Sequence, residues 1–192
     1  MPFCKNKNIR NLMKTFLLTA MGVFAIFSTI TLTSCKEDKC KTTVCAYSGV
    51  CNEDGSCTCQ TGYEGERCET ITRNKFKGAW RVTEDGTASN PAQYAMSVEN
   101  GNAIDEVKIR NFYNLFNVEI TAKVKGDTIY IATQTVTVGE DTKTIEGKGY
   151  AVPEEYYDLH GKVIMSYRVI SSDGGVNDFG MAGGNNASIW TK

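Results

Sequence analysis

Six cysteines lie within residues 40–69, and their spacing constrains the fold more than any other feature of the chain. They are separated by 4, 5, 5, 1 and 8 residues and are Cys40, Cys45, Cys51, Cys57, Cys59 and Cys68. A segment this short cannot bury enough apolar surface to fold without crosslinks. It contains no histidine and no Cys-x₂-Cys pair, so the pattern favours disulfides over a metal site.

The first 34 residues have the parts of a secretory signal. The segment up to Thr15 carries four basic residues and no acid, and the stretch from Phe16 to Leu32 is almost wholly apolar or small. That stretch of 17 residues lies at the lower limit for a membrane-spanning helix, which is the alternative interpretation, but no basic stop-transfer cluster follows it. We therefore expect residues 1–34 to be removed, with either Met1 or Met13 as the true start.

Cys35 ends the apolar stretch in the sequence Leu32-Thr33-Ser34-Cys35. Small residues let the extended backbone enter a peptidase groove, and a thiol can accept a lipid. The motif resembles the lipobox of bacterial lipoproteins, which implies cleavage before Cys35 and acylation at this residue. One acyl chain holds a protein to a membrane weakly, whereas two or three give a lasting anchor. The alternative is a cysteine that stands there by chance.

Residues 35–39 form a lipidated cysteine followed by a charged tether. The sequence Lys36-Glu37-Asp38-Lys39 cannot enter a bilayer and acts as a solvated spacer. It also resembles the signal that directs Bacteroidetes lipoproteins to the cell surface. That resemblance implies an outer-membrane lipoprotein exposed on the surface, with the membrane as its partner.

Removal of the signal changes both the cysteine count and the charge. Of the eight cysteines, Cys4 is lost and Cys35 carries lipid, which leaves six for three bridges in an oxidising compartment. Residues 1–34 hold four of the 21 basic residues and no acid, so 17 basic and 22 acidic residues remain, a net charge of −5. An acidic chain argues against nucleic acid as a partner.

Residues 40–69 are expected to form a two-stranded hairpin with bridges as its core. Asn52 to Ser56 contains an Asp-Gly pair that suits a hairpin turn, but six cysteines allow many pairings that spacing cannot distinguish. The run CTCQTGYEGERC at residues 57–68 resembles an EGF-like domain. The resemblance implies the bridges Cys40–Cys51, Cys45–Cys57 and Cys59–Cys68. The order of acids that binds calcium in some such domains is missing before Cys40, so no metal is expected.

Residues 75–192 are long enough for one hydrophobic core, and apolar residues alternate along them with period two. The predicted strands are 76–83, 94–99, 107–112, 118–124, 129–131, 134–138, 142–150, 163–170 and 187–191. Frequent strands with Gly, Asn or Asp between them indicate an all-β antiparallel barrel or sandwich. The opening sequence Phe76-Lys77-Gly78-Ala79-Trp80 resembles the Gly-x-Trp strand of lipocalin-like barrels. We expect Trp80 to be buried on a face shared with Phe76, Gly78 and Val82.

No set of residues in the sequence assembles a catalytic site. His160 is the only histidine, and it is expected to be an exposed turn residue. Glu154, Glu155 and Asp158 form the densest acidic group, and two opposed carboxylates could hydrolyse a glycosidic bond, but a solvated loop explains them as well. The loop at 173–178 offers oxygen ligands without the spacing of an EF-hand. We therefore expect no enzyme activity, no cofactor and no metal.

The sequence as a whole predicts a membrane-anchored, non-enzymatic binding or interaction protein. Its ligand is either a small apolar molecule or glycan within a barrel, or another envelope protein on the outer face. The alternatives are a glycan hydrolase that uses Glu154, Glu155 or Asp158, and a purely structural spacer. The sequence assigns no ligand-binding residues and no oligomeric state.

Overall fold

The structure, a computed structural model, describes residues 38–152 and 161–192. The disulfide-bonded part of the chain lies at the start of this region. Its short elements are η1 (Lys39–Lys41), β1 (Val50–Cys51), β2 (Cys57–Thr58), β3 (Tyr63–Glu64), β4 (Thr70–Ile71) and η2 (Thr72–Lys75). The bridges are Cys40–Cys51, Cys45–Cys57 and Cys59–Cys68. These are the pairs that the EGF-like resemblance implied. We call residues 40–69 the disulfide module.

The turn of the module has the geometry that its sequence predicts. β1 pairs with β2 so that Cys51 lies opposite Cys57, and Asn52 N–H donates to Ser56 C=O at 2.8 Å. Gly55 has a φ of +86°, a conformation that glycine adopts without steric penalty. The loop is therefore closed by backbone hydrogen bonds as well as by the neighbouring bridges.

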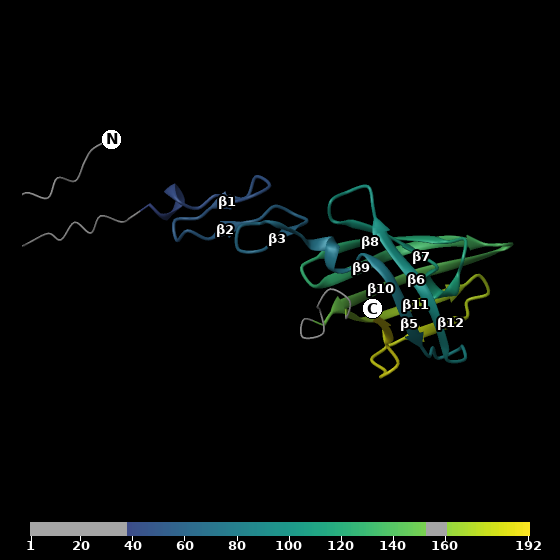
Figure 1. The fold of residues 1–192 in the computed structure, drawn as a ribbon. Coiled ribbons are helices and arrows are strands. Elements are labelled where there is room, and N and C mark those ends of the chain that lie inside the picture. The colour runs from purple at the N-terminus through teal and green to yellow at the C-terminus, as the bar shows by residue number, and fades with distance from the viewer. Residues whose placement is uncertain (1–37, 153–160) are drawn as a thin grey trace, which may run out of the picture. The chain divides into compact units, whose positions relative to one another are not determined.

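The rest of the chain forms a closed antiparallel barrel (Figure 1). Its strands are β5 (Gly78–Glu84), β6 (Ala92–Asn100), β7 (Glu106–Arg110), β8 (Glu119–Lys125), β9 (Thr128–Val138), β10 (Asp141–Ala151), β11 (Lys162–Ser171), β12 (Val176–Phe179) and β13 (Ser188–Thr191). Eight of them run in the ring order β5-β6-β7-β8-β9-β10-β11-β13, and β13 returns to β5. The expectation of an all-β fold is confirmed, and of the two architectures the structure has the barrel, which is compatible with a lipocalin-like fold.

Two short strands share one edge of β11 at the seam of the barrel. β13 pairs with β11 over Lys162–Met165, and β12 pairs with it farther along, over Arg168–Ile170. Sequence analysis predicted only a glycine-rich loop where β12 begins. β12 is four residues long, which is too short for its alternation to stand out from the loop.

β9 is one strand where the sequence predicted two. Its inward-facing residues Ile129 and Ile131 are followed by two exposed positions in succession, so the alternation breaks. The partner strand β10 has a β-bulge between Ile145 and Gly147. A bulge lets a strand change register and continue, and β9 therefore runs on to Val138.

β8 and β9 separate beyond their first three paired residues. The ladder joins Lys123–Lys125 to Thr128–Tyr130 and stops there. Gln134 then takes the place of a backbone group, since its Oε1 accepts from Thr121 N–H at 3.0 Å and its Nε2 donates to Thr121 C=O at 2.8 Å. The side-chain amide satisfies backbone groups that the splayed strands leave unpaired.

Aromatic and aliphatic side chains of the described residues pack against one another in the interior of the barrel. Tyr167 stacks on Phe179 with ring centroids 4.3 Å apart, and Phe112 meets Tyr167 edge-on at 4.7 Å. Trp80 and Trp190 lie 6.3 Å apart and are 2% and 1% exposed. The inward alternation of Val82, Ile109, Ile120, Ile129 and Met165 completes this core.

Trp80 is buried, as its place in the alternating strand predicts. Its Nε1 donates to Phe76 C=O at 2.7 Å, and Lys192 Nζ lies 4.5 Å from the centre of its ring. The ring therefore joins the start of the barrel to β13 and the residue that follows it.

We expect Trp80→Ala to lower the free energy of unfolding by about 3–5 kcal/mol, because the change removes a large buried ring and leaves a cavity. Urea denaturation followed by circular dichroism would measure the loss. Tyr150→Ala is the matched control, since Tyr150 is 49% exposed and a surface change there should alter stability by roughly 0.5 kcal/mol or less. Equal unfolding curves for Trp80→Ala and the unaltered protein would contradict this role.

Candidate functional site

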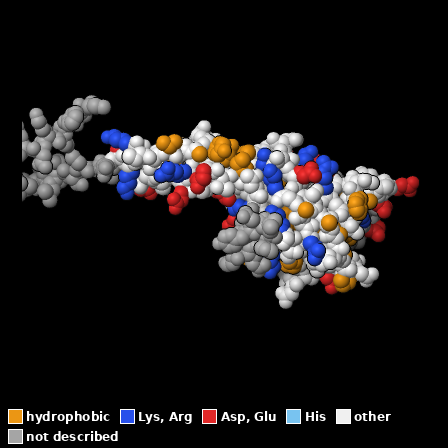
Figure 2. Space-filling model, viewed as in Figure 1, with side chains coloured by type: hydrophobic (Ala, Val, Ile, Leu, Met, Phe, Trp, Pro, Cys, Tyr) orange, Lys and Arg blue, Asp and Glu red, His pale blue; other side chains and the backbone are white. Residues whose placement is uncertain are grey.

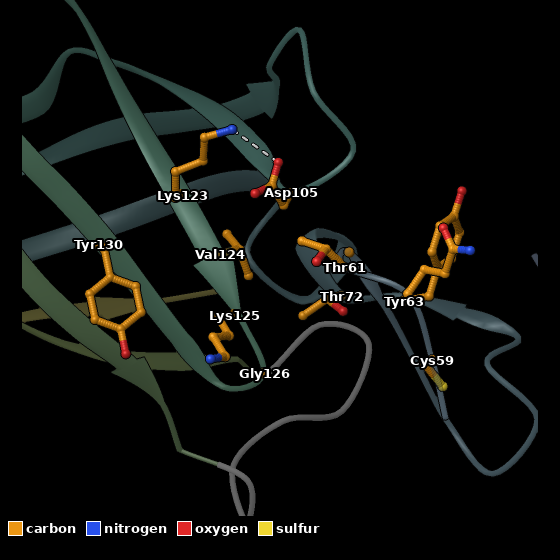
Figure 3. Close-up of a pocket in the computed structure, with 12 residues that line it drawn as sticks. Cys59, Thr61, Tyr63, Thr72, Asp105, Lys123, Val124, Lys125, Gly126 and Tyr130 are labelled. Atoms are coloured by element: carbon orange, nitrogen blue, oxygen red, sulfur yellow. Dashed lines mark hydrogen bonds and ion pairs between the residues drawn. The ribbon is translucent and has the colours of Figure 1, made fainter. Parts of the chain in front are cut away.

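An open groove of about 500 Å³ lies where the disulfide module meets the outside of the barrel (Figure 3). One wall consists of residues 59–63 together with Thr72, and the other of Asp105, residues 123–126 and Tyr130. The volume falls within the range of small-molecule sites. The groove is thus built from segments about 60 residues apart in the sequence.

Tyr130 lines the barrel side of the groove with a partly exposed aromatic ring. It lies on β9 between Lys123 of β8 and Lys148 of β10, each directly opposite it in the sheet. Lys148 Nζ lies 5.6 Å from the ring centroid, so one face of the ring is occupied by a cation–π contact. The ring is 39% exposed, and Tyr130 forms part of the groove wall.

Lys123 and Asp105 form a donor and acceptor pair in the same wall. Lys123 Nζ lies 3.0 Å from Asp105 Oδ1 and 3.5 Å from Glu106 Oε2, and Figure 3 shows the first contact as a dashed line. The hydrogen bond that Lys123 donates to Asp105 is the main reason that the pKa of Lys123 is raised, and the charge of Glu106 adds to it. The lysine is therefore held charged beside carboxylates that balance it.

Two basic residues of η2, Arg73 and Lys75, connect the two walls of the groove. The guanidinium of Arg73 donates to the carbonyls of Ala103 at 2.7 Å and Glu106 at 3.1 Å, in the β6–β7 turn and at the start of β7. Lys75 Nζ lies 2.8 Å from Glu64 of β3 and also pairs with Asp127, just before β9. Burial opposes the charge of Lys75, but the hydrogen bonds that Lys75 donates to Asp127 and Glu64 outweigh it and raise its pKa. These contacts fix η2 against residues 101–106 and, through Lys75, join Glu64 to Asp127.

A second group of polar residues lies inside the barrel around Glu84, which is 7% exposed. Glu84 Oε1 accepts from Tyr94 Oη at 2.9 Å, and Oε2 accepts from Tyr167 Oη at 2.8 Å and from Ser188 Oγ at 2.9 Å. Trp190 Nε1 in turn donates to Ser188 Oγ at 3.2 Å. The carboxylate thus receives hydroxyl donors from β6, β11 and β13.

The environment of Glu84 opposes its ionisation. Burial is the largest influence and raises the pKa of the carboxyl, while the hydrogen bonds from Tyr167, Ser188 and Tyr94 act against that rise. The pKa values of Tyr94 and Tyr167 are also raised, first by burial and then by nearby charge. Among the described residues, the donors to Glu84 are side chains of the barrel itself, so the group forms a hydrogen-bonded internal network.

The sequence predicted candidate acidic residues at 154–158 and in the loop at 173–178. Glu154, Glu155, Asp158 and His160 lie outside the described residues, as does Cys35. Asp173 lies in the turn after β11, where its Oδ1 accepts from Gly175 N–H at 2.9 Å, and Asp178 lies on β12. Among residues 38–152 and 161–192 no three acids, histidines or cysteines gather in the way that holds a metal ion.

Sequence analysis did not identify Glu84 or Tyr130 as site residues. Glu84 could have been found, because it continues the inward alternation of Trp80 and Val82 and so places a carboxylate inside the barrel. Tyr130 gave no comparable signal, since its partners in the groove are distant in the sequence. No periodic pattern links residues 59–63 to residues 123–130.

Comparison with known proteins places the chain in no group: no protein-family profile matches it and no curated protein matches it. Within the described parts of the chain there is no helix of the length and apolarity that a membrane crossing requires.

We expect Glu84→Gln to change how stability depends on pH. The folded state of the unaltered protein holds the Glu84 proton above the ordinary pKa of 4.5, so unfolding releases a proton between that value and the raised pKa. The free energy of unfolding therefore falls as pH rises through this window, and above it the contribution is constant. Urea titrations of both proteins from acidic to neutral pH should show Glu84→Gln gaining stability relative to the unaltered protein as pH rises.

Glu146→Gln provides a control of opposite sign. The hydrogen bonds from Thr133 and Arg168 lower the pKa of Glu146, so its contribution is present above the ordinary pKa and lost as pH falls. As the pH falls, the unaltered protein should therefore lose stability when Glu146 is protonated, and the Glu146→Gln protein should lose less. Parallel pH profiles for Glu84→Gln and the unaltered protein would contradict the assigned environment of Glu84.

Proposed function

We propose that this protein is a non-enzymatic binding lipoprotein of the cell surface, held in the outer membrane by acyl chains on Cys35. The lipobox at residues 32–35 and the charged tether at 36–39 support the anchor and the surface location. In this proposal the chain is a Bacteroidetes-type lipoprotein, and its partners are the membrane and a ligand recognised by the folded part.

The disulfide module supports the further proposal that residues 40–69 are an EGF-like domain. Its bridges join the first cysteine to the third, the second to the fourth and the fifth to the sixth. The module also exposes large apolar side chains, visible over its elements in Figure 2; the most exposed are Val44, Tyr47 and Val50. A domain of this kind would space the barrel from the lipid and contribute one wall of the groove.

The packed interior of the barrel carries the proposal that recognition occurs on the outer surface. The rings of Phe112, Tyr167 and Phe179 pack against one another in the interior, which is where a barrel of this size can enclose a small ligand. The groove that contains Tyr130 lies outside, is open and has polar as well as apolar lining residues. A small apolar molecule within the barrel is therefore the less favoured ligand.

The anchor is tested with Cys35→Ser in the producing bacterium. We expect fatty-acid labelling of the protein to be lost, because the acceptor thiol is gone, and a precursor or soluble form to accumulate. Cys4→Ser is the matched control and should keep the label. Label that persists in Cys35→Ser would contradict the lipobox assignment.

The site of recognition is tested with apolar fluorescent probes added to the purified protein. A filled interior predicts no saturable change in the fluorescence of Trp80 and Trp190, which both lie in the core. A polarity-sensitive probe with its own emission gives a second measurement. Saturable binding of one probe per protein with quenching of the buried tryptophans would place the ligand inside the barrel and overturn recognition at the outer surface.

A further inference from the structure

We infer that the groove binds a neutral saccharide chain, which stacks on the free face of Tyr130. This inference rests on the proposed function, because it gives a ligand class to the outer surface that the proposal assigns to recognition. It is argued from the ring of Tyr130, from the polar groups beside it and from the charge balance of the walls.

The ring of Tyr130 can serve as a flat surface on which a ligand stacks. Lys148 lies over one face with its Nζ 5.6 Å from the centroid, and among the described residues no other cation or aromatic ring is stacked on Tyr130. Ile129 and Ile131, the neighbours along β9, are buried, which holds the backbone that carries the ring. A sugar ring has a face of C–H groups that packs against such an aromatic surface, because the aromatic face is electron-rich.

The groups around the ring match the hydroxyls at the edge of a sugar. Lys123 and Asp105 place an ammonium and a carboxylate 3.0 Å apart, so a pair of neighbouring hydroxyls could donate to one and accept from the other. On the opposite wall, Gln60 Nε2 donates to Ser48 C=O at 3.2 Å, which fixes the orientation of its amide. Thr61 adds an exposed hydroxyl.

The charge of the walls favours a neutral chain over an anionic one. Lys123 is balanced by Asp105 and Glu106, and Lys75 by Glu64 and Asp127. Only Lys125 among the cations that line the groove has no ion-pair partner among the described residues. The lining sets polar groups such as those of Lys123, Asp105 and Gln60 beside apolar surface, as a sugar with hydroxyl edges and C–H faces requires, and the open groove suits a chain that continues beyond it.

The experiment is affinity electrophoresis of the full-length protein in native detergent gels that contain a soluble polysaccharide. The probes are three neutral chains, a β-glucan, an α-mannan and a xylan, and one anionic chain, polygalacturonate. We expect at least one neutral chain to retard the protein. Tyr130→Ala should weaken that retardation by about tenfold or more, as expected for loss of an aromatic anchor, while Tyr130→Phe should retain it.

Tyr150→Ala is the matched control for the ring. Tyr150 lies on the adjacent strand β10, on the same outer face, opposite Thr128 of β9, and is 49% exposed but does not line the groove. Its loss should leave the retardation unchanged. An equal loss in Tyr130→Ala and Tyr150→Ala would overturn the groove as the site.

The remaining outcomes also decide the inference. Retardation by none of the four chains would overturn saccharide binding, and retardation by polygalacturonate alone would overturn the neutral class. Either result leaves the proposed function to its own tests, because labelling of Cys35 and the response of the buried tryptophans do not depend on the ligand of the groove. If the unaltered protein carried no fatty-acid label at Cys35, the proposed anchor would be contradicted, and the saccharide result would still hold.

Discussion

The closure of the barrel depends on a carboxylate placed where an apolar side chain would be expected. Glu84 lies at the end of β5 and receives hydroxyl groups from β6, β11 and β13. Burying a carboxylate is unfavourable unless hydrogen bonds compensate for the lost water, so the strands must be close enough to supply those donors together. A barrel opened between β5 and β13 would lose the Ser188 contact and leave the buried acid under-satisfied, which penalises the open state.

The sequence predicted most of the strands because their alternation is strong. The face that contains Trp80 and Val82 is buried as expected, and the strands that follow it differ from prediction mainly at their ends. The exceptions have local causes. Phe112 lies outside its predicted strand because Asn111 has a φ of +61° and Tyr113 a φ of +55°. The alternation of apolar residues does not predict this left-handed turn.

The candidate groove was beyond sequence analysis for a different reason. Its walls come from a segment held by Cys59–Cys68 and from a hairpin of the barrel, and they are joined by Arg73 and Lys75. The spacing of these residues along the chain follows neither helix nor strand periodicity. Charged residues such as Arg73 are ordinarily exposed, so nothing marked it in advance as a donor to three turn carbonyls.

The seam between the first and last strands of the barrel has a kinetic consequence. Glu84 and Ser188 are 104 residues apart, and pairing of such distant strands is characteristic of slowly folding β proteins. Until β13 reaches β5, the incomplete sheet keeps an unpaired edge that can add strands from other molecules. The same contact that makes the finished barrel continuous therefore makes its assembly vulnerable to aggregation, and conditions that delay the arrival of β13 would lower the yield of folded protein before they affected its stability.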